Sequence, residues 1–229
     1  MNIWYLNHYA TPPHLGAPGR PYALATNLQK LGHNVMIVRA TSRGGEQSVQ
    51  PEDYNQCRLY AGVNYYHIPT RTYQGNGLGR LMNMLDYSYG VRKLSAKNNT
   101  QELDRPDVLI PSCVHPLAFP PAHFLAKKYG AKLIYEVRDI WPLSLVELLG
   151  VPSMHPLVLW FGWIEKRAYR YADAVVSLLP NALDHMGQLG LEKWKFHFIP
   201  NGIDRREWEA PAVPLPAEHE KTIKKIKEQ

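Results

Sequence analysis

Three of the four residues in Glu136-Val137-Arg138-Asp139 are charged, and they come directly after the apolar run 133–135. Charges beside a buried strand need partners, because an unpaired charge is costly in a low-dielectric interior. Side chains alternate along a strand, so we expect Glu136 and Arg138 on one face and Asp139 on the other. Asp139 could orient a sugar hydroxyl, act as a base or cap the next helix, and we take it as the catalytic candidate. Glu136 and Arg138 are candidate substrate-binding residues, with an ion pair plus a helix cap as the structural alternative.

The segment 16–21, which reads GAPGRP, joins a first apolar run to a helical pattern. Glycines such as Gly16 and Gly19 let backbone N–H groups approach a phosphate, and a helix N-terminus adds a favourable dipole. Arg20 could pair with a phosphate or a carboxylate. We therefore predict a phosphate-binding loop that also includes Ala17, with a plain Gly/Pro turn as the alternative. The segment is neither a GxGxxG fingerprint nor a Walker A loop.

Two further segments follow apolar runs and carry polar groups. His115 could bind substrate or phosphate, although a lone histidine in a loop is more often only a hydrogen-bonding residue. The neighbouring Cys113 would need an independent base and an oxyanion hole to act as a nucleophile, and the sequence indicates neither. Asn201-Gly202 is a strong turn signal before a proline-rich stretch, and it is typical of the exit from a domain.

Alternating strand and helix patterns must position these residues. Expected strands cover residues 3–6, 35–38, 65–68, 107–110, 133–137, 174–179 and 196–199. Expected helices cover residues 20–31, 79–97, 117–128, 142–149, 156–171 and 182–189. Apolar strands that alternate with helices indicate an α/β, Rossmann-like parallel sheet of about seven strands with helices on both faces. Ligands of such sheets bind beyond the carboxyl ends of the strands, which is where the candidate residues lie.

The composition excludes several classes of protein. With 229 residues, 45% apolar and 20% charged, the chain can build a sizeable core, and two cysteines cannot form a disulfide scaffold. No apolar run is long enough to span a bilayer, and the N-terminus is not a signal peptide, so we expect a cytoplasmic protein. The net charge is +6, but no dense Lys/Arg block of the nucleic-acid-binding kind occurs, so no nucleic-acid partner is expected.

The apolar segment 157–164 contains Trp160 and Trp163 and precedes the basic residues Lys166 and Arg167. Exposed aromatic residues beside basic ones suit a peripheral contact with the inner face of a membrane. Core packing explains the same apolar residues equally well, so both readings stay open. At the other end of the chain, prolines at 211–216 indicate a linker.

The order of these motifs is more specific than any one of them. Four segments follow the glycine-containing first loop. They are LQKLGHNV at 28–35, EVRDIWP at 136–142, EKRAYRYADAVV at 165–176 and IPNGID at 199–204. This succession resembles the N-terminal domain of family 4 glycosyltransferases, which have the GT-B architecture. Within that family it is similar to the bacterial branch that builds surface polysaccharides, including N-acetylfucosamine transferases. The resemblance covers about residues 1–210.

The resemblance implies a retaining transfer of a hexosyl or N-acetylhexosaminyl group from a nucleotide-sugar, with no cofactor and usually no metal. The acceptor would be a polysaccharide or a lipid-linked sugar of the cell envelope. In this family the first loop reaches the donor diphosphate, which assigns that role to Gly16, Gly19 and Arg20. Asp139 falls where the family places a polar residue that touches the transferred sugar. Asn201-Gly202 falls at the hinge between two domains.

The sequence departs from the family pattern at its C-terminal side. Full members carry a second α/β domain with a glutamate pair that grips the donor, and neither occurs here. We therefore expect residues 1–206 to be the acceptor-side domain and residues 207–229 to be a linker and the start of a missing C-terminal domain, inactive alone. Alternatives are a binding module that pairs with a separate donor-binding subunit, and a nucleotide-sugar epimerase. An NAD-dependent enzyme is disfavoured by the missing GxGxxG.

Overall fold

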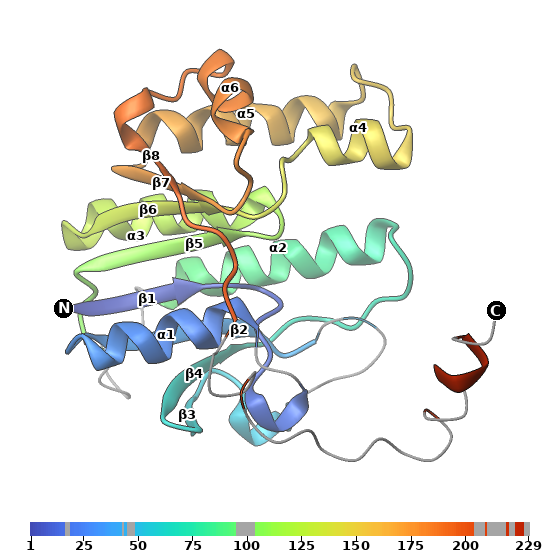
Figure 1. Ribbon diagram of the computed structural model, residues 1–229. Coiled ribbons are helices and arrows are strands. Elements are labelled where there is room, and N and C mark those ends of the chain that lie inside the picture. The colour runs from blue at the N-terminus through green and yellow to red at the C-terminus, as the bar shows by residue number, and fades with distance from the viewer. Residues whose placement is uncertain are drawn as a thin grey trace.

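The computed structural model describes residues 1–16, 19–42, 44, 49–94, 104–203, 209, 219 and 223–226, and in them the chain folds around one eight-stranded sheet (Figure 1). The strands are β1 (Asn2–Leu6), β2 (Asn34–Ala40), β3 (Cys57–Tyr60), β4 (Val63–Ile68), β5 (Val108–Cys113), β6 (Lys132–Val137), β7 (Ala174–Ser177) and β8 (Phe196–Phe198). The α-helices are α1 (Arg20–Lys30), α2 (Leu78–Lys93), α3 (Phe119–Tyr129), α4 (Leu143–Leu149), α5 (Pro156–Tyr171) and α6 (Ala182–Gln188). Short 3₁₀ turns are η1 (Pro13–Leu15), η2 (Pro51–Asp53), η4 (Pro116–Ala118) and η5 (Lys193–Lys195).

The strands follow the order β3-β4-β2-β1-β5-β6-β7-β8, and all neighbours are parallel except β3 and β4. The predicted α/β fold with a mostly parallel sheet is confirmed. The expected number of seven strands is one too few, because the antiparallel edge strand β3 was not predicted. Cys57–Tyr60 has two exposed and two half-buried residues, so it lacks the apolar run that marks a strand covered on both faces.

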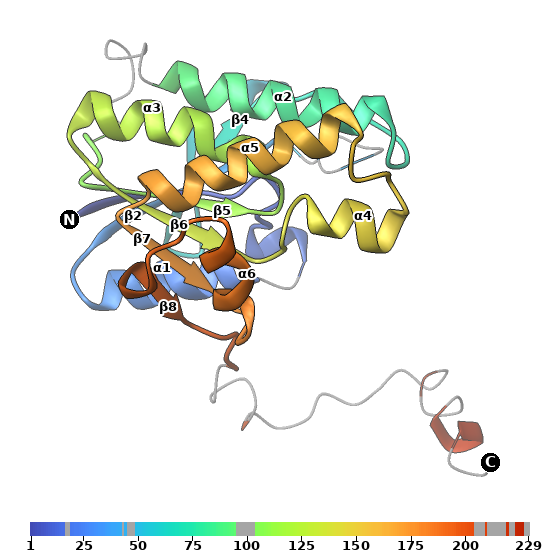
Figure 2. The same cartoon turned by 90° about the horizontal axis from the view of Figure 1, so that it is seen from above.

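Both faces of the sheet are covered, which explains the continuous apolar runs of its central strands. In β1, Ile3 and Tyr5 belong to the core on the α1 side, whereas Trp4 and Leu6 belong to the core that α2, α3 and α5 cover. Figure 2 shows α1 on one side of the sheet and α2, α3 and α5 on the other. Because β1, β5, β6, β7 and β8 run parallel, the carboxyl ends of β1, β5, β6 and β8 lie at the same edge of the sheet.

Glycine is needed where helices end or pack closely. Gly130 follows α3 with φ of +64°, a left-handed conformation that favours glycine and stops the helix. Gly90 lies inside α2, where a Cβ atom would come within 2.2 Å of Ile68 Cγ2. The missing side chain at Gly90 therefore lets α2 pack directly against β4.

The predicted linker, residues 207–229, lies mostly outside the described residues. Only positions 209, 219 and 223–226 of it are described, and 223–226 are helical. The boundary at residue 206 therefore stays a prediction.

Candidate functional site

A buried hydrogen-bond network lies at the carboxyl edge of the sheet, on the α1 side. Its centre is Glu136 near the end of β6, whose side chain is 2% exposed. The Oε1 atom of Glu136 accepts from Arg20 Nε at 2.8 Å, and Oε2 accepts from Ser112 Oγ at 2.6 Å and from the hydroxyl of Tyr5. Asn7 Nδ2 donates to Ser112 Oγ at 3.0 Å and extends the network. Three strands and α1 thus converge on one carboxylate.

The chemistry of this network follows from its burial. Burial raises the pKa of Tyr5 well above its usual value, the Glu136 charge raises it further, and the charge of Arg138 lowers it. Tyr5 therefore stays a neutral hydrogen-bond donor. β6 ends at Val137, so Arg138 lies just beyond the strand, and the expectation that it shares one face with Glu136 stays a prediction.

Arg20 connects the first loop to the segment that leaves β8. Its Nε donates to Glu136, while Nη2 donates to the carbonyl oxygen of Ile199 at 2.9 Å. Its Nη1 donates to the carbonyl oxygen of Pro200 at 2.9 Å and to Asn201 Oδ1 at 3.4 Å. The structure therefore brings together three of the sequence-predicted residues, Arg20, Glu136 and Asn201. Gly202 follows them as an exposed residue of the same segment.

The first loop ends at the N-terminus of α1. Gly19 is the N-cap residue in an extended conformation, and Pro21 occupies the first turn, where its missing N–H costs nothing. Among the described residues no acidic side chain lies in that turn, so the positive end of the helix dipole is not neutralised there. Gly16 has φ of +150°, which glycine adopts without strain, whereas Ala17 lies outside the described residues.

A second polar cluster lies on the α2 side of the same edge. His115 after β5 and His8 after β1 are both fully buried, and His115 Nε2 lies 2.8 Å from His8 Nδ1. Burial lowers the pKa of His115 to about 3 and the pKa of His8 well below its usual value, so both rings are neutral. The other ring nitrogens, His8 Nε2 and His115 Nδ1, have no hydrogen-bond partner among the described residues.

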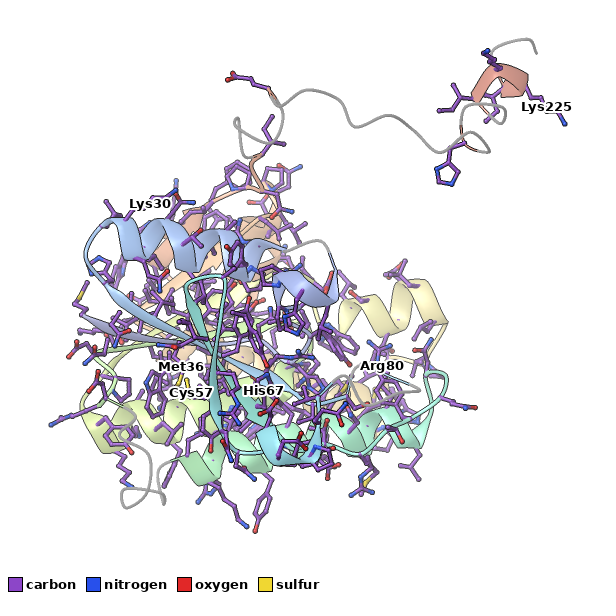
Figure 3. All side chains as sticks on the ribbon, turned by 90° about the horizontal axis from the view of Figure 1, so that it is seen from below. Lys30, Met36, Cys57, His67, Arg80 and Lys225 are labelled. Atoms are coloured by element: carbon purple, nitrogen blue, oxygen red, sulfur yellow. The ribbon has the colours of Figure 1, made fainter. Side chains whose placement is uncertain are left out.

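Aromatic rings and one arginine surround the histidine pair. The Tyr9 and Tyr87 rings lie 4.4 and 4.6 Å from the His8 ring, between centroids. Arg80, which Figure 3 shows on α2, lies near enough for its charge to lower the pKa of both histidines. Sequence reasoning selected His115 but missed His8. The available signal was that both histidines follow strands whose carboxyl ends meet at one edge.

Asp139 lies just beyond β6 and is exposed. Burial of part of its side chain raises its pKa, and Arg138 opposes this shift. The residue does not cap the next helix, because α4 begins at Leu143 after Pro142 as the N-cap residue. The cap alternative is therefore wrong, and Asp139 remains the catalytic candidate.

Cys113, which the sequence analysis disfavoured as a nucleophile, is buried. Burial raises the pKa of its thiol to about 12, so it is protonated at neutral pH. Its Sγ donates weakly to the Asp139 carbonyl oxygen at 3.8 Å. In the part of the chain that the structure describes, no three His, Cys, Asp or Glu side chains gather as a metal site would require.

Core packing explains part of segment 157–164, and the exposure that the membrane reading requires is found at other residues, so membrane contact stays a prediction. Val158, Phe161 and Ile164 of α5 are buried in the core. Trp160 and Trp163 are exposed, Trp163 by 55%, and the Arg167 guanidinium lies 4.7 Å from the Trp163 ring centroid. Other exposed apolar residues of α4, α5 and their connection are Leu143, Leu148, Leu149, Met154 and Leu159. Within the described residues, no helix is long and apolar enough to cross a bilayer.

The architecture is that of known GT-B glycosyltransferases. A sucrose-phosphate synthase from Thermosynechococcus elongatus superposes with a TM-score of 0.59 at 12% identity, covering 92% of this chain and 53% of that one. An E. coli trehalose-6-phosphate synthase structure bound with UDP-2-fluoro glucose gives 0.61 at 10% identity, with 99% and 55% covered. Anabaena HepE in complex with UDP-glucose gives 0.53 at 12% identity, with 99% and 50% covered. The chain thus spans about half the length of these similar structures.

The sequence of residues 16–202 matches the family of glycosyl transferase 4-like domains, and the chain belongs to that family. No curated protein matches the chain in sequence. The family match begins at the first glycine of the loop before α1 and ends at Gly202, so it includes every predicted site residue.

Proposed function

We propose that this domain is the acceptor-side half of a retaining glycosyltransferase that moves a sugar from a nucleotide-sugar to a polysaccharide or lipid-linked acceptor. The main support is the family match over residues 16–202 together with polar clusters at the carboxyl edge of the sheet. Structural neighbours that bind UDP-glucose or UDP-2-fluoro glucose support a nucleotide-sugar donor. The branch related to N-acetylfucosamine transferases is part of this proposal.

The roles of the residues follow from their chemistry. Backbone N–H groups near Gly16 and Gly19 and the N-terminus of α1 would face the donor diphosphate, without a metal or a cofactor. His115, as a neutral ring with one unsatisfied buried nitrogen, would accept or donate one hydrogen bond to a sugar hydroxyl. Asp139 would stabilise the positive charge that develops on the transferred sugar.

Stabilising that charge requires preorganised groups on both sides of a cleft. Because residues 1–203 supply one side only, we propose that the chain alone has little or no transferase activity. Asn201 and Gly202 would then act as the hinge to a donor-binding domain. A non-catalytic module that pairs with a separate donor-binding subunit is the first alternative, and a nucleotide-sugar epimerase is the second.

A panel of nucleotide-sugars tests this proposal. The chain alone and the natural full-length protein are each incubated with UDP-, GDP- and TDP-sugars and lipid-linked acceptors, and the anomeric configuration of the product is read by NMR. We expect retained configuration with the full-length protein only and a large loss of rate in Asp139→Asn. Arg71→Gln, which removes an exposed ion pair, is the control. A product with inverted anomeric configuration would refute the retaining mechanism. Transfer by the chain alone would refute the proposal that it is half of an enzyme. A nucleotide-sugar that is epimerised without transfer would favour the epimerase.

We also propose that the exposed apolar residues of α4 and α5 contact an anionic membrane surface, which would bring the domain to a lipid-linked acceptor. Trp160 and Trp163 would enter the interface while Arg167 meets lipid phosphates. The test is co-sedimentation with vesicles of phosphatidylcholine containing phosphatidylglycerol. The double variant Trp160→Ser/Trp163→Ser should lose binding, whereas Leu31→Ser, at a more exposed apolar site after α1, should not. Unchanged binding of the double variant would refute this contact.

A further inference from the structure

Arg20 stands at a position where a positive charge needs a structural reason. It is the first residue of α1, and a cation at a helix N-terminus is unfavourable because it meets the positive end of the dipole. Its side chain is nevertheless only 8% exposed, and the side chain of its ion-pair partner Glu136 is 2% exposed. The carboxylate of Glu136 offsets the guanidinium charge, so the charge of Arg20 is accounted for within the protein.

All three nitrogen atoms of the Arg20 guanidinium already donate to protein acceptors. Glu136 occupies Nε, the carbonyl oxygen of Ile199 occupies Nη2, and Pro200 and Asn201 share Nη1. Ile199, Pro200 and Asn201 are exposed residues beyond β8, where only the Ile199 amide continues the strand by donating to Ser177. Among the described residues, Arg20 is a hydrogen-bond donor to the carbonyl groups of both 199 and 200.

We propose that Arg20 is a positioning residue that clamps segment 199–201 to the carboxyl edge of the sheet, and is not a free ligand for a donor diphosphate. The guanidinium is suited to this because its planar fork can hold one carboxylate and several carbonyl groups at once. The clamp sets the direction in which the chain leaves the domain. Calling that exit a hinge rests on the proposed function, whereas the clamp itself does not.

Amide hydrogen exchange of the ¹⁵N-labelled chain tests the clamp without any transferase assay. In Arg20→Gln, the amide of Ile199, which donates to the Ser177 carbonyl oxygen, should exchange at least about tenfold faster, because the charge-assisted hydrogen bonds that hold the segment against β7 are lost. Amides of β1 should keep their protection. Arg71→Gln, which removes the exposed ion pair with Asp86, is the matched control and should leave all these amides unchanged.

Arg20→Lys separates the clamp from the ion pair. A lysine ammonium can pair with Glu136 but cannot reach three carbonyl or amide acceptors in a plane as well. We expect the lysine variant to recover thermal stability, while exchange of the Ile199 amide stays fast. If lysine restores protection of that amide as well, or if Arg20→Gln leaves its exchange within about twofold of the wild type, the clamp is wrong.

A measurement on the unmodified chain covers the case in which Arg20→Gln does not fold. The Arg20 Nε–H signal, assigned by its loss in Arg20→Lys, is followed during titration with UDP. The clamp predicts that this signal does not move, even if backbone signals near Gly19 do. A shift of the Nε–H signal together with faster exchange of the Ile199 amide would show that Arg20 is a nucleotide ligand and overturn the proposal. If no signal responds to UDP, donor binding by this domain fails while the exchange data still decide the clamp.

Discussion

Glu165 should make the stability of this domain fall as the pH rises. It is a glutamate of α5 that is 3% exposed, and its Oε1 accepts from the Tyr169 hydroxyl at 2.7 Å. His185 Nε2 lies 3.4 Å from the same oxygen, and burial lowers the pKa of His185. Burial raises the pKa of Glu165 to about 7, although Tyr169 and Lys166 oppose the shift. The folded state therefore holds a proton that the unfolded chain has already lost.

The expected loss of folding stability follows from the size of the pKa shift of Glu165. A carboxyl whose pKa is 4.5 in the unfolded chain and about 7 in the folded one contributes stability that is fully present below 4.5. This contribution is lost as the pH rises through about 7. Since one pKa unit corresponds to 1.36 kcal/mol, the loss reaches about 3 kcal/mol. Glu165→Gln, which keeps the shape but does not titrate, should remove that loss.

Urea unfolding at several pH values measures this directly. The free energy of unfolding of Glu165→Gln minus that of the wild type should rise by about 3 kcal/mol between roughly pH 4 and pH 8. Titration of the buried histidines cancels in this difference, because both proteins contain them. Glu147→Gln, at an exposed position of α4, controls for the removal of one carboxylate. A difference for Glu165→Gln that stays flat within about 0.5 kcal/mol would refute the reasoning.

Three further changes follow from the packing and burial. Gly90→Ala should lower the free energy of unfolding by about 1–3 kcal/mol, because the new Cβ overlaps Ile68. Calorimetry of the double variant with Ile68→Ala should find that most of this loss is removed. Burial, and next the charge of Arg39, lowers the pKa of His67 to about 4. The free energy of unfolding should therefore fall as the pH drops from about 6.5 to 4, and it should depend less on pH in this range in His67→Gln. Glu136→Leu should cost about 3–5 kcal/mol by leaving Arg20 buried without its carboxylate, and a thermal midpoint equal to that of the wild type would contradict this.

Most of the fold could be predicted from the sequence. All seven expected strands and all six expected helices are present, with small shifts at their ends, because elements covered on both faces carry long apolar signals. The edge strand β3 could not be found in this way, since an edge strand pairs on one side only and Cys57–Tyr60 keeps exposed side chains. Only the tertiary structure shows that β3 pairs with β4, and in which register.

The candidate site could be predicted only as separate residues. Arg20, Glu136 and Asn201 were each selected because of their type and because they follow strands or begin a helix. Their hydrogen bonds to one another join positions up to 181 residues apart, and the role of Arg20 changed from a proposed phosphate ligand to a proposed clamp. Tyr5 gave no sequence signal, because a tyrosine in an apolar strand is ordinary, and the one signal for His8 was its position after a predicted strand.

The sequence by itself determined the alternation of strands and helices, the glycines that end helices and the family to which the motifs point. These features depend on neighbours within a few residues, and local patterns record them. Only the tertiary structure decided that the ends of β1, β5, β6 and β8 meet, and therefore which polar groups are paired, buried or neutral. The physical reason is that burial and pairing energies depend on distances through space, which the spacing of residues along the chain does not specify.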